Sequence, residues 1–401
     1  MGLFRVFNRR VFSITAVMLL GTALLACQSG GVGFGLPDPA PTEPPAQELP
    51  EAKGEIIGNG DVRVALLLPL SAPGNAAKIA GELKNAASMA MEDWGMQSLQ
   101  LVIKDTLGTP NGAVDAASEA SAEGASLVLG PLFAGNVTAV TGVLRPAGKT
   151  IMAFSSDSRV GGQGVYLSSF LPETIIDRTL TYAVSSGQRD IIAILPNGGI
   201  GNLAAAQINK TLPRVGGRLV TTVRYDYNDA SVEAAIEALA PSLPEAQAIF
   251  IPDGGSTPGA IVNTMRRRGL SLEGKKLLGT GQWASSDLKN PALAGAWFAD
   301  SDQASIASFK TKYSAKFGTT PSAVAPLAYD AVALVSGIVK RFGATGLTSE
   351  TIESRTGYSG YTGVFRFLPD GSNERGLAVY EISGDDLRVV SPAPRAFSRG
   401  F

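Results

Sequence analysis

Serine residues at the ends of expected strands carry polar groups that could hold a small ligand. Ser71 follows the aliphatic run 62–68, and Ser155 and Ser156 follow the run 150–154. Hydroxyls and backbone N–H groups at helix N-termini favour an anion without needing a buried cation. The same serines also cap helices and turns in ordinary βα loops, so the sequence leaves both roles open.

Residues that commonly drive catalysis are scarce in this chain. It has no histidine, and Cys27 is its only cysteine. Histidine triads, histidine general bases and histidine metal ligands are therefore excluded together. Asp105 follows an expected strand, but no base, metal ligand or second carboxylate stands at a fixed spacing from it. We expect no catalytic residue, no metal and no cofactor.

The stretch that contains Ser71 combines a strand, a turn and the start of a helix. Its first part, 62–68, is almost unbroken aliphatic apart from Arg63, which suits a strand buried on both faces of a parallel sheet. Pro69 ends the strand, and a helical pattern follows. Ligands of open α/β sheets bind at the carboxyl ends of such strands. Since the loop has neither a Walker lysine nor GxGxxG, the sequence favours a pocket for a small polar ligand over a nucleotide site.

The N-terminus has the pattern of an export signal. Arg5, Arg9 and Arg10 precede an apolar stretch, which predicts a signal peptide over 1–26. Its ending, LLAC, resembles the bacterial lipobox and implies that Cys27 is acylated and anchors the protein to a membrane. Gln28 follows where inner-membrane lipoproteins have Asp, which implies the periplasmic face of the outer membrane. The paired arginines leave twin-arginine export open beside the general route.

Composition separates a tether from a folded part. Residues 27–60 are rich in Pro and Gly and have no apolar period, so we expect a flexible tether. The remainder is long enough for two domains. The net charge of −1 and the pI of about 5.8 argue against nucleic acid as a partner.

Strand and helix patterns alternate along the folded part, which predicts parallel sheets with right-handed crossovers. The pattern pauses near 165–172 and then resumes, so we expect two consecutive α/β sheets in a two-lobed protein. A final hairpin is expected between 361–367 and 376–382. The other expected strands are 62–68, 99–104, 126–129, 150–154, 191–195, 218–225, 246–251 and 276–279.

Several stretches together resemble one family. They are LLLPLSAPGN (66–75), LVLGPLFAGNV (127–137), IMAFSSDS (151–158), PLAYDAVALV (326–335) and GYTGVFRFLPDGSNERGLAVYEI (360–382). In order and spacing they resemble type I periplasmic binding proteins of the leucine-binding group. The resemblance implies two doubly wound parallel sheets joined by a three-crossing hinge, with crossings near Ser168, Asp300 and Tyr358. The implied lobes are 61–168 with 301–357 and 169–300 with 358–385, followed by a tail, 386–401.

Two functions follow from this resemblance. The segments LLLPLS and LGPLF, together with the expected lipid anchor, look most like those of lipoproteins described as penicillin-binding protein activators. That likeness implies a non-catalytic envelope protein that activates peptidoglycan synthesis through contact with a penicillin-binding protein. The alternative is the solute receptor of an ABC importer for amino-acid-like or other small polar ligands.

The resemblance also assigns positions to a ligand cleft. In the receptors, loops of the first lobe hold the ligand carboxylate, and a carboxylate of the second lobe pairs with the ligand ammonium. The second-lobe positions carry no carboxylate here, although Asp253 lies nearby, so a zwitterion is a doubtful ligand. The implied cleft residues are Ser71, Leu132, Phe133, Ala134, Ser155, Ser156, Ile200, Asp253, Gln282 and Trp283.

Overall fold

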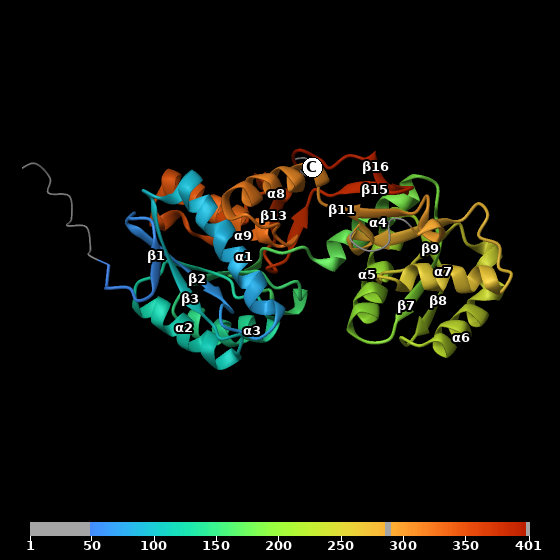
Figure 1. The fold of residues 1–401 in the computed structure, drawn as a ribbon, viewed down its shortest axis with the longest axis horizontal. Coiled ribbons are helices and arrows are strands. Elements are labelled where there is room, and N and C mark those ends of the chain that lie inside the picture. The colour runs from blue at the N-terminus through green and yellow to red at the C-terminus, as the bar shows by residue number, and fades with distance from the viewer. Residues whose placement is uncertain (1–48, 285–289, 398–401) are drawn as a thin grey trace, which may run out of the picture. The chain divides into compact units, whose positions relative to one another are not determined.

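The computed structural model describes residues 49–284 and 290–397 (Figure 1). The expected signal peptide, Cys27 and most of the expected tether lie outside these residues. None of the described helices combines the length and the apolar character needed to cross a membrane.

The first sheet has the strand order β1-β3-β2-β4-β5-β6, in which β2 to β6 are parallel and β1 is antiparallel to β3. Its buried aliphatic strands are joined by helices, as the alternating pattern predicts. The strands are β1 (Glu55–Ile57), β2 (Val62–Leu68), β3 (Leu99–Asp105), β4 (Leu127–Leu129), β5 (Thr150–Ala153) and β6 (Val165–Leu167). The helices are α1 (Asn75–Ala90), which continues as a π-helical turn η1 (Met91–Gly95), α2 (Pro110–Ala122) and α3 (Ala134–Leu144).

Strand β2 is buried along its whole length because helices cover both faces of the first sheet. Leu66 and Leu68 belong to one hydrophobic cluster with α1, whereas Ala65 and Leu67 belong to a second cluster with α2 and α3. Alternate residues of a strand point to opposite faces, which explains this division. The expectation of a strand buried on both faces is confirmed.

The second sheet has the order β16-β15-β11-β10-β9-β7-β8. Its strands β7 to β11 are parallel, and β15 and β16 add antiparallel pairs beside β11. The strands are β7 (Asp190–Pro196), β8 (Arg218–Tyr225), β9 (Ala248–Phe250), β10 (Lys276–Thr280), β11 (Trp297–Asp300), β15 (Ala378–Ser383) and β16 (Asp386–Ser391). The helices are α4 (Pro172–Ser185), α5 (Gly199–Val215), α6 (Asp229–Leu239) and α7 (Thr257–Arg267), with short turns η3 (Ala240–Glu245), η4 (Gly281–Ala284) and η5 (Pro291–Leu293).

After the second sheet the chain returns to the first. Helices α8 (Gln303–Phe317) and α9 (Ala325–Phe342) share a hydrophobic cluster with α1, and Figure 1 shows them in orange beside the blue helix. A small sheet follows, made of β12 (Tyr358–Gly360), β13 (Gly363–Phe367) and β14 (Asn373–Arg375). Two lobes built on mostly parallel sheets are the predicted fold class, which is confirmed.

The final hairpin is different from the one expected. Strand β13 pairs with β14, and β15 pairs with β11 and β16, so 361–367 and 376–382 are not partners. Phe365 and Phe367 pack in the cluster of the first sheet, whereas Tyr380 packs in that of the second. The small sheet therefore goes with the first lobe, and the chain passes to the second lobe near Leu377, later than the expected crossing near Tyr358.

Both ends of the described chain are more ordered than composition predicts. The expected tether extended to residue 60, but β1 pairs with β3, and Pro50 O accepts a hydrogen bond of 2.5 Å from Arg63 Nη1. The expected tail from 386 begins with β16. Strand β1 has only three residues, which is too short a pattern to show in the sequence.

A network of buried polar groups joins α9 and the small sheet to the segment after β6. Asp330 of α9 accepts hydrogen bonds from Tyr361 N and Thr362 N at 2.8 Å. The Thr362 hydroxyl also accepts from Arg375 Nη1 at 2.7 Å, while Arg375 Nε donates to Ser169 O at 2.9 Å. Burial raises the pKa of Asp330 and lowers the pKa of Arg375 to about 10. Each charged group depends on its partners, since an unpaired buried charge is costly.

The last described residues, 392–397, form a segment that we call the strap. It leaves β16 and returns to the small sheet. The Arg366 guanidinium lies 4.6 Å from the centre of the Phe397 ring. The same ring lies against Gly357, where an added Cβ would come within 2.8 Å of it, and Pro394 packs on Gly376. The strap thus links β16 of the second sheet to the small sheet of the first lobe.

Candidate functional site

Each large sheet has one point where the chain reverses its direction across the strands. In the first sheet the chain moves from β2 outward to β3 and then returns to β4 on the other side of β2. In the second sheet it moves from β7 to β8 and returns to β9. Ligands of open α/β sheets bind outside the carboxyl ends of the strands at such switch points. The candidate site therefore lies at the ends of β2, β4, β7 and β9.

The helices that follow these four strands begin without a side-chain cap. Gly74, Phe133, Gly198 and Ser256 hold the N-cap positions of α1, α3, α5 and α7, and none caps the helix through its side chain. Their neighbours α2 and α6 are capped, by Thr109 and Asn228 in turn. An uncapped N-terminus leaves backbone N–H groups and the positive end of the helix dipole available. Both switch points can thus attract an anion.

At the first switch point, Asp105 organises the loop that contains Ser71. Asp105 Oδ1 accepts backbone hydrogen bonds from Leu70 at 3.0 Å, Ser71 at 3.4 Å and Leu107 at 2.9 Å. Partial burial raises the pKa of Asp105, but hydrogen bonds from Ser71, Leu107 and Leu70 outweigh burial and leave the pKa below its usual value. The donors expected to hold a ligand anion after β2 therefore already hold an internal carboxylate.

The start of α3 remains open. The Phe133 side chain is 37 % exposed, and its neighbours Leu132 and Ala134 are half-buried. Leu132 packs against the cluster that contains Leu66. Asn136, in the first turn, is buried, and its Nδ2 has no hydrogen-bond partner within the described part of the chain. This amide adds an unused donor beside the helix N-terminus.

The two serines after β5 have different surroundings. Ser155 is buried, and its hydroxyl accepts a hydrogen bond from Asp157 N at 3.2 Å. Ser156 is exposed and free to donate to a ligand. Ser155 thus shapes the turn, as serine does in many loops, while Ser156 keeps the binding role that the sequence left open.

At the second switch point, Asp253 is buried beneath two tyrosines. Tyr225 donates to Asp253 Oδ2, and Tyr227 donates to Asp253 Oδ1 at 2.9 Å. The two rings meet edge to face at 5.9 Å. Burial is the larger cause that raises the pKa of both tyrosines, and the hydrogen bond to Asp253 is the next. Both hydroxyls therefore stay protonated and act as donors. Asp253, which the resemblance places near the ligand-ammonium position of the cleft, therefore has both oxygens bonded within the protein.

The other expected residues of the second lobe divide between surface and core. Ile200, in the first turn of α5, is 53 % exposed, and Gln282 is exposed beside Gly254. Trp283 differs from its expected place, because its side chain is fully buried in the cluster of the second sheet. Its indole N–H donates to Asp253 O at 2.6 Å, and Gly279 leaves room for the ring. Trp283 thus supports the loop after β9 from within.

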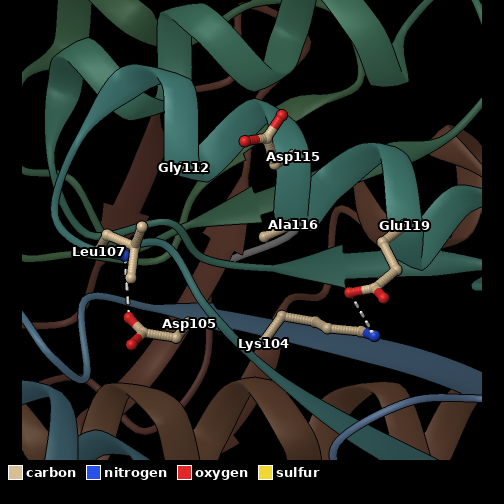
Figure 2. Close-up of a pocket in the computed structure, with 7 residues that line it drawn as sticks. All are labelled: Lys104, Asp105, Leu107, Gly112, Asp115, Ala116 and Glu119. Atoms are coloured by element: carbon tan, nitrogen blue, oxygen red, sulfur yellow. Dashed lines mark hydrogen bonds and ion pairs between the residues drawn. The ribbon is translucent and has the colours of Figure 1, made fainter.

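A surface hollow of about 400 Å³ lies one strand away, between β3 and α2 (Figure 2). Asp105, Asp115 and Glu119 line it together with Lys104, which forms an ion pair of 2.9 Å with Glu119. Excess negative charge makes this hollow unsuitable for an anion. Within the described residues, no group of three acidic, cysteine or histidine side chains is arranged to hold a metal ion.

Comparison with known proteins identifies the family of the chain. A family model for periplasmic binding proteins matches residues 61–386, and the chain belongs to that family. Members of this family are substrate-binding proteins and are generally non-catalytic, and the family suggests a periplasmic or envelope location. No curated protein matches the chain.

Solved structures show the same fold at low sequence identity. A putative branched-chain amino acid ABC transporter protein from Rhodospirillum rubrum is 18 % identical with a TM-score of 0.71, covering 82 % of this chain and 99 % of its own. A branched-chain amino acid ABC transporter ligand-binding protein from Burkholderia xenovorans is 19 % identical with a TM-score of 0.66, covering 83 % and 96 %. An ABC transporter substrate-binding protein from Desulfitobacterium hafniense, solved with leucine, is 16 % identical with a TM-score of 0.60, covering 82 % and 99 %.

Proposed function

We propose that this chain is a solute-binding protein of the cell envelope and that its ligand is a small carboxylate without a paired ammonium group. The observation that carries the proposal is the set of uncapped helices at both switch points. Backbone N–H groups there, with the Ser156 hydroxyl and the Asn136 amide beside the first sheet, supply donors for a carboxylate.

The bonding of Asp253 within the protein weighs between ligand classes. Asp253 is bonded to Tyr225 and Tyr227, so it offers no vacant oxygen to a ligand ammonium. An ammonium that loses its water without gaining a partner costs several kcal/mol. Similar folds have been solved with leucine and with benzoate, and the present residues favour ligands of the second kind.

Thermal unfolding with added ligand tests this proposal. Benzoate and 3,4-dihydroxybenzoate should raise the melting temperature, while leucine at the same concentration should raise it less. A ligand at one hundred times its Kd stabilises the fold by about 2.7 kcal/mol. Ser156→Ala should weaken the shift, whereas Ser126→Ala, at the opposite edge of the same sheet, serves as the matched control. The proposal fails if leucine stabilises the protein and the aromatic acids do not.

A second candidate is a regulator that acts through protein contacts, in which a penicillin-binding protein is the partner. Two expected ligand positions favour it, because groups of the protein already bind there. Asp105 accepts hydrogen bonds from the backbone of the loop after β2, and two tyrosines donate to Asp253. Co-purification with a bifunctional penicillin-binding protein, and a faster transglycosylase or transpeptidase rate, would support it. Unchanged rates and no association would remove it.

The proposed location is the periplasmic face of the outer membrane, where an acyl chain on Cys27 holds the protein. Metabolic labelling with a fatty acid should mark the wild-type chain and leave Cys27→Ala unlabelled. Fractionation should then find the wild type with membranes and the variant in the soluble periplasm. Equal distribution of the two would contradict the lipid anchor.

A further inference from the structure

A second hollow, of about 360 Å³, lies in the first lobe between η1, α8, α9 and β12. Trp94 precedes β3, so this hollow lies away from the carboxyl edge where the switch point is. Its volume falls at the lower end of the range of small-molecule sites. We call it the aromatic pocket, and its principal walls are Trp94, Tyr329 and Tyr361.

The aromatic side chains of this pocket are held in fixed positions. Trp94 is 51 % exposed, yet its indole N–H donates to the Tyr329 hydroxyl at 3.0 Å. The Tyr329 hydroxyl in turn donates to Asp93 at 2.5 Å. The rings of Tyr329 and Tyr361 meet edge to face at 5.0 Å, and Phe309 supports Tyr361 at 5.3 Å. The exposed Trp94 ring is thus a rigid apolar surface rather than a mobile side chain.

The carboxylates around the aromatic pocket have partners within the protein. Asp330 in its wall is bonded to the backbone and hydroxyl of Thr362 and to Tyr361 N, and Arg375 lies behind Thr362. Asp93 forms an ion pair with Lys312. Neither carboxylate lacks a partner, and the Lys340 ammonium, 6.0 Å from the centre of the Trp94 ring, is exposed to solvent. The pocket therefore offers no buried, unpaired charge that would select a cation or an anion. It suits a neutral ligand.

The polar groups that remain available are hydroxyls. Ser308 and Ser359 are exposed and line the pocket, and the half-buried Tyr361 also lines it. Within the described residues, these three hydroxyls form no hydrogen bond with other groups. The indole N–H of Trp94 is already used, so it is not free to bind a peptide carbonyl, which weighs against a proline-rich peptide as the occupant.

We propose that the aromatic pocket binds a neutral saccharide. One apolar face of a sugar ring lies on Trp94, and its hydroxyl groups exchange hydrogen bonds with Ser308, Ser359 and Tyr361. Amphipathic rings of this kind suit a flat aromatic surface bordered by small hydroxyls. This site is independent of the proposed carboxylate site and stands if that proposal fails.

Titration of the protein with N,N′,N″-triacetylchitotriose and, separately, maltotriose tests the inference. Intrinsic tryptophan fluorescence is a direct readout because Trp283 is buried and Trp297 is half-buried, which leaves Trp94 as the exposed reporter. Saturable binding of at least one sugar, confirmed by calorimetry, is the expected result. Trp94→Ala should weaken it at least tenfold, and Ser308→Trp, which fills the pocket from the surface of α8, should also abolish it.

Controls separate loss of the pocket from loss of the fold. Trp297→Phe, in the second sheet, should leave sugar binding unchanged, and the melting temperatures of Trp94→Ala and Ser308→Trp show whether each variant is folded. The inference is overturned if neither sugar binds saturably, if binding persists in both folded variants, or if only a proline-rich peptide saturates the site. Unchanged stabilisation by benzoate in these variants would show that the two sites are separate.

Discussion

The two switch points have the same topology and differ in the side chains around them. At the first sheet, the start of α3 and Ser156 offer unused donors at the surface. At the second sheet, the nearby carboxylate of Asp253 is buried and bonded, and Trp283 lies in the core beneath it. A shared fold therefore fixes where a ligand can bind, while a few buried side chains decide which charges it can carry.

Two aspartates that end strands show the same contrast. Asp105 ends β3 in the first sheet, and donors lower its pKa despite partial burial. Asp300 ends β11 in the second sheet, where burial raises its pKa to about 6 although Ser301 N and Gln303 Nε2 donate to it. Hydrogen-bond donors stabilise the negative charge of Asp105, whereas burial disfavours the negative charge of Asp300.

The largest expected effect comes from Trp283→Ala. Removing a fully buried indole from the second sheet should lower the free energy of unfolding by about 3–5 kcal/mol, because a cavity remains. Urea unfolding measures the loss. Gln282→Ala, at the exposed neighbouring position, should change stability by less than about 0.5 kcal/mol. A small loss for Trp283→Ala with a large loss of ligand affinity would instead place the ring in a ligand site.

Tyr225→Phe should have the next largest effect. The buried Asp253 oxygen loses its donor, which costs about 1–3 kcal/mol in chemical unfolding. Tyr227 is 66 % exposed, so Tyr227→Phe should cost less because water replaces its hydroxyl. If the carboxylate excludes an ammonium only because tyrosines occupy it, the double variant should bind leucine better relative to benzoate. An unchanged ratio would contradict this account of ligand class.

The pH dependence of stability should distinguish Asp300 from Asp300→Asn. The pKa of Asp300 is higher in the folded state than in the unfolded state. Between about pH 4 and 6 the folded state therefore binds more protons than the unfolded state. The contribution of Asp300 to stability therefore falls as pH rises through this window and stays low above it. Relative to wild type, the variant should gain about 1–2 kcal/mol between pH 4 and 7. If the stabilities of the two proteins change with pH in the same way, the raised pKa of Asp300 is refuted.

The smallest expected effect concerns the first sheet. Asp105→Asn should free backbone donors of Leu70, Ser71 and Leu107 and remove a negative charge from that edge. Affinity for benzoate should rise by about 1 kcal/mol or less, given the size of single hydrogen-bond effects. Asp115→Asn, in the hollow of Figure 2, is the control for charge alone. Equal gains in both variants would show that the loop donors play no part.

Local pattern was sufficient to predict the fold but not the partners of short strands. Strand β2 was predicted with its observed limits, because seven apolar-rich residues between a glycine-containing turn and Pro69 form a clear signal. Strand β14 is three residues long and pairs with β13, while its Asn373 and Arg375 side chains donate to Ser169 O in the segment after β6. Those side-chain bonds reach about two hundred positions along the chain, which periodicity cannot reveal.

The strands that border the candidate site were predictable, whereas the surroundings of its residues were not. Counting along the chain placed Trp283 and Asp253 correctly after their strands, but not their burial. Burial of Trp283 depends on the missing side chain of Gly279, and that of Asp253 on Tyr225 and Tyr227 of the preceding strand and loop. The sequence likewise did not predict that Asp105 holds the loop after β2, because its partners are backbone N–H groups, which every residue type except proline has.

The strap has a consequence for how the molecule denatures. Phe397 on Gly357 and Pro394 on Gly376 connect β16 to the small sheet, so the last residues cannot detach without disturbing both lobes. Heating should consequently produce a single calorimetric transition for the intact chain. A chain that stops at Ser391 should show two transitions, with each half of the molecule melting at its own temperature.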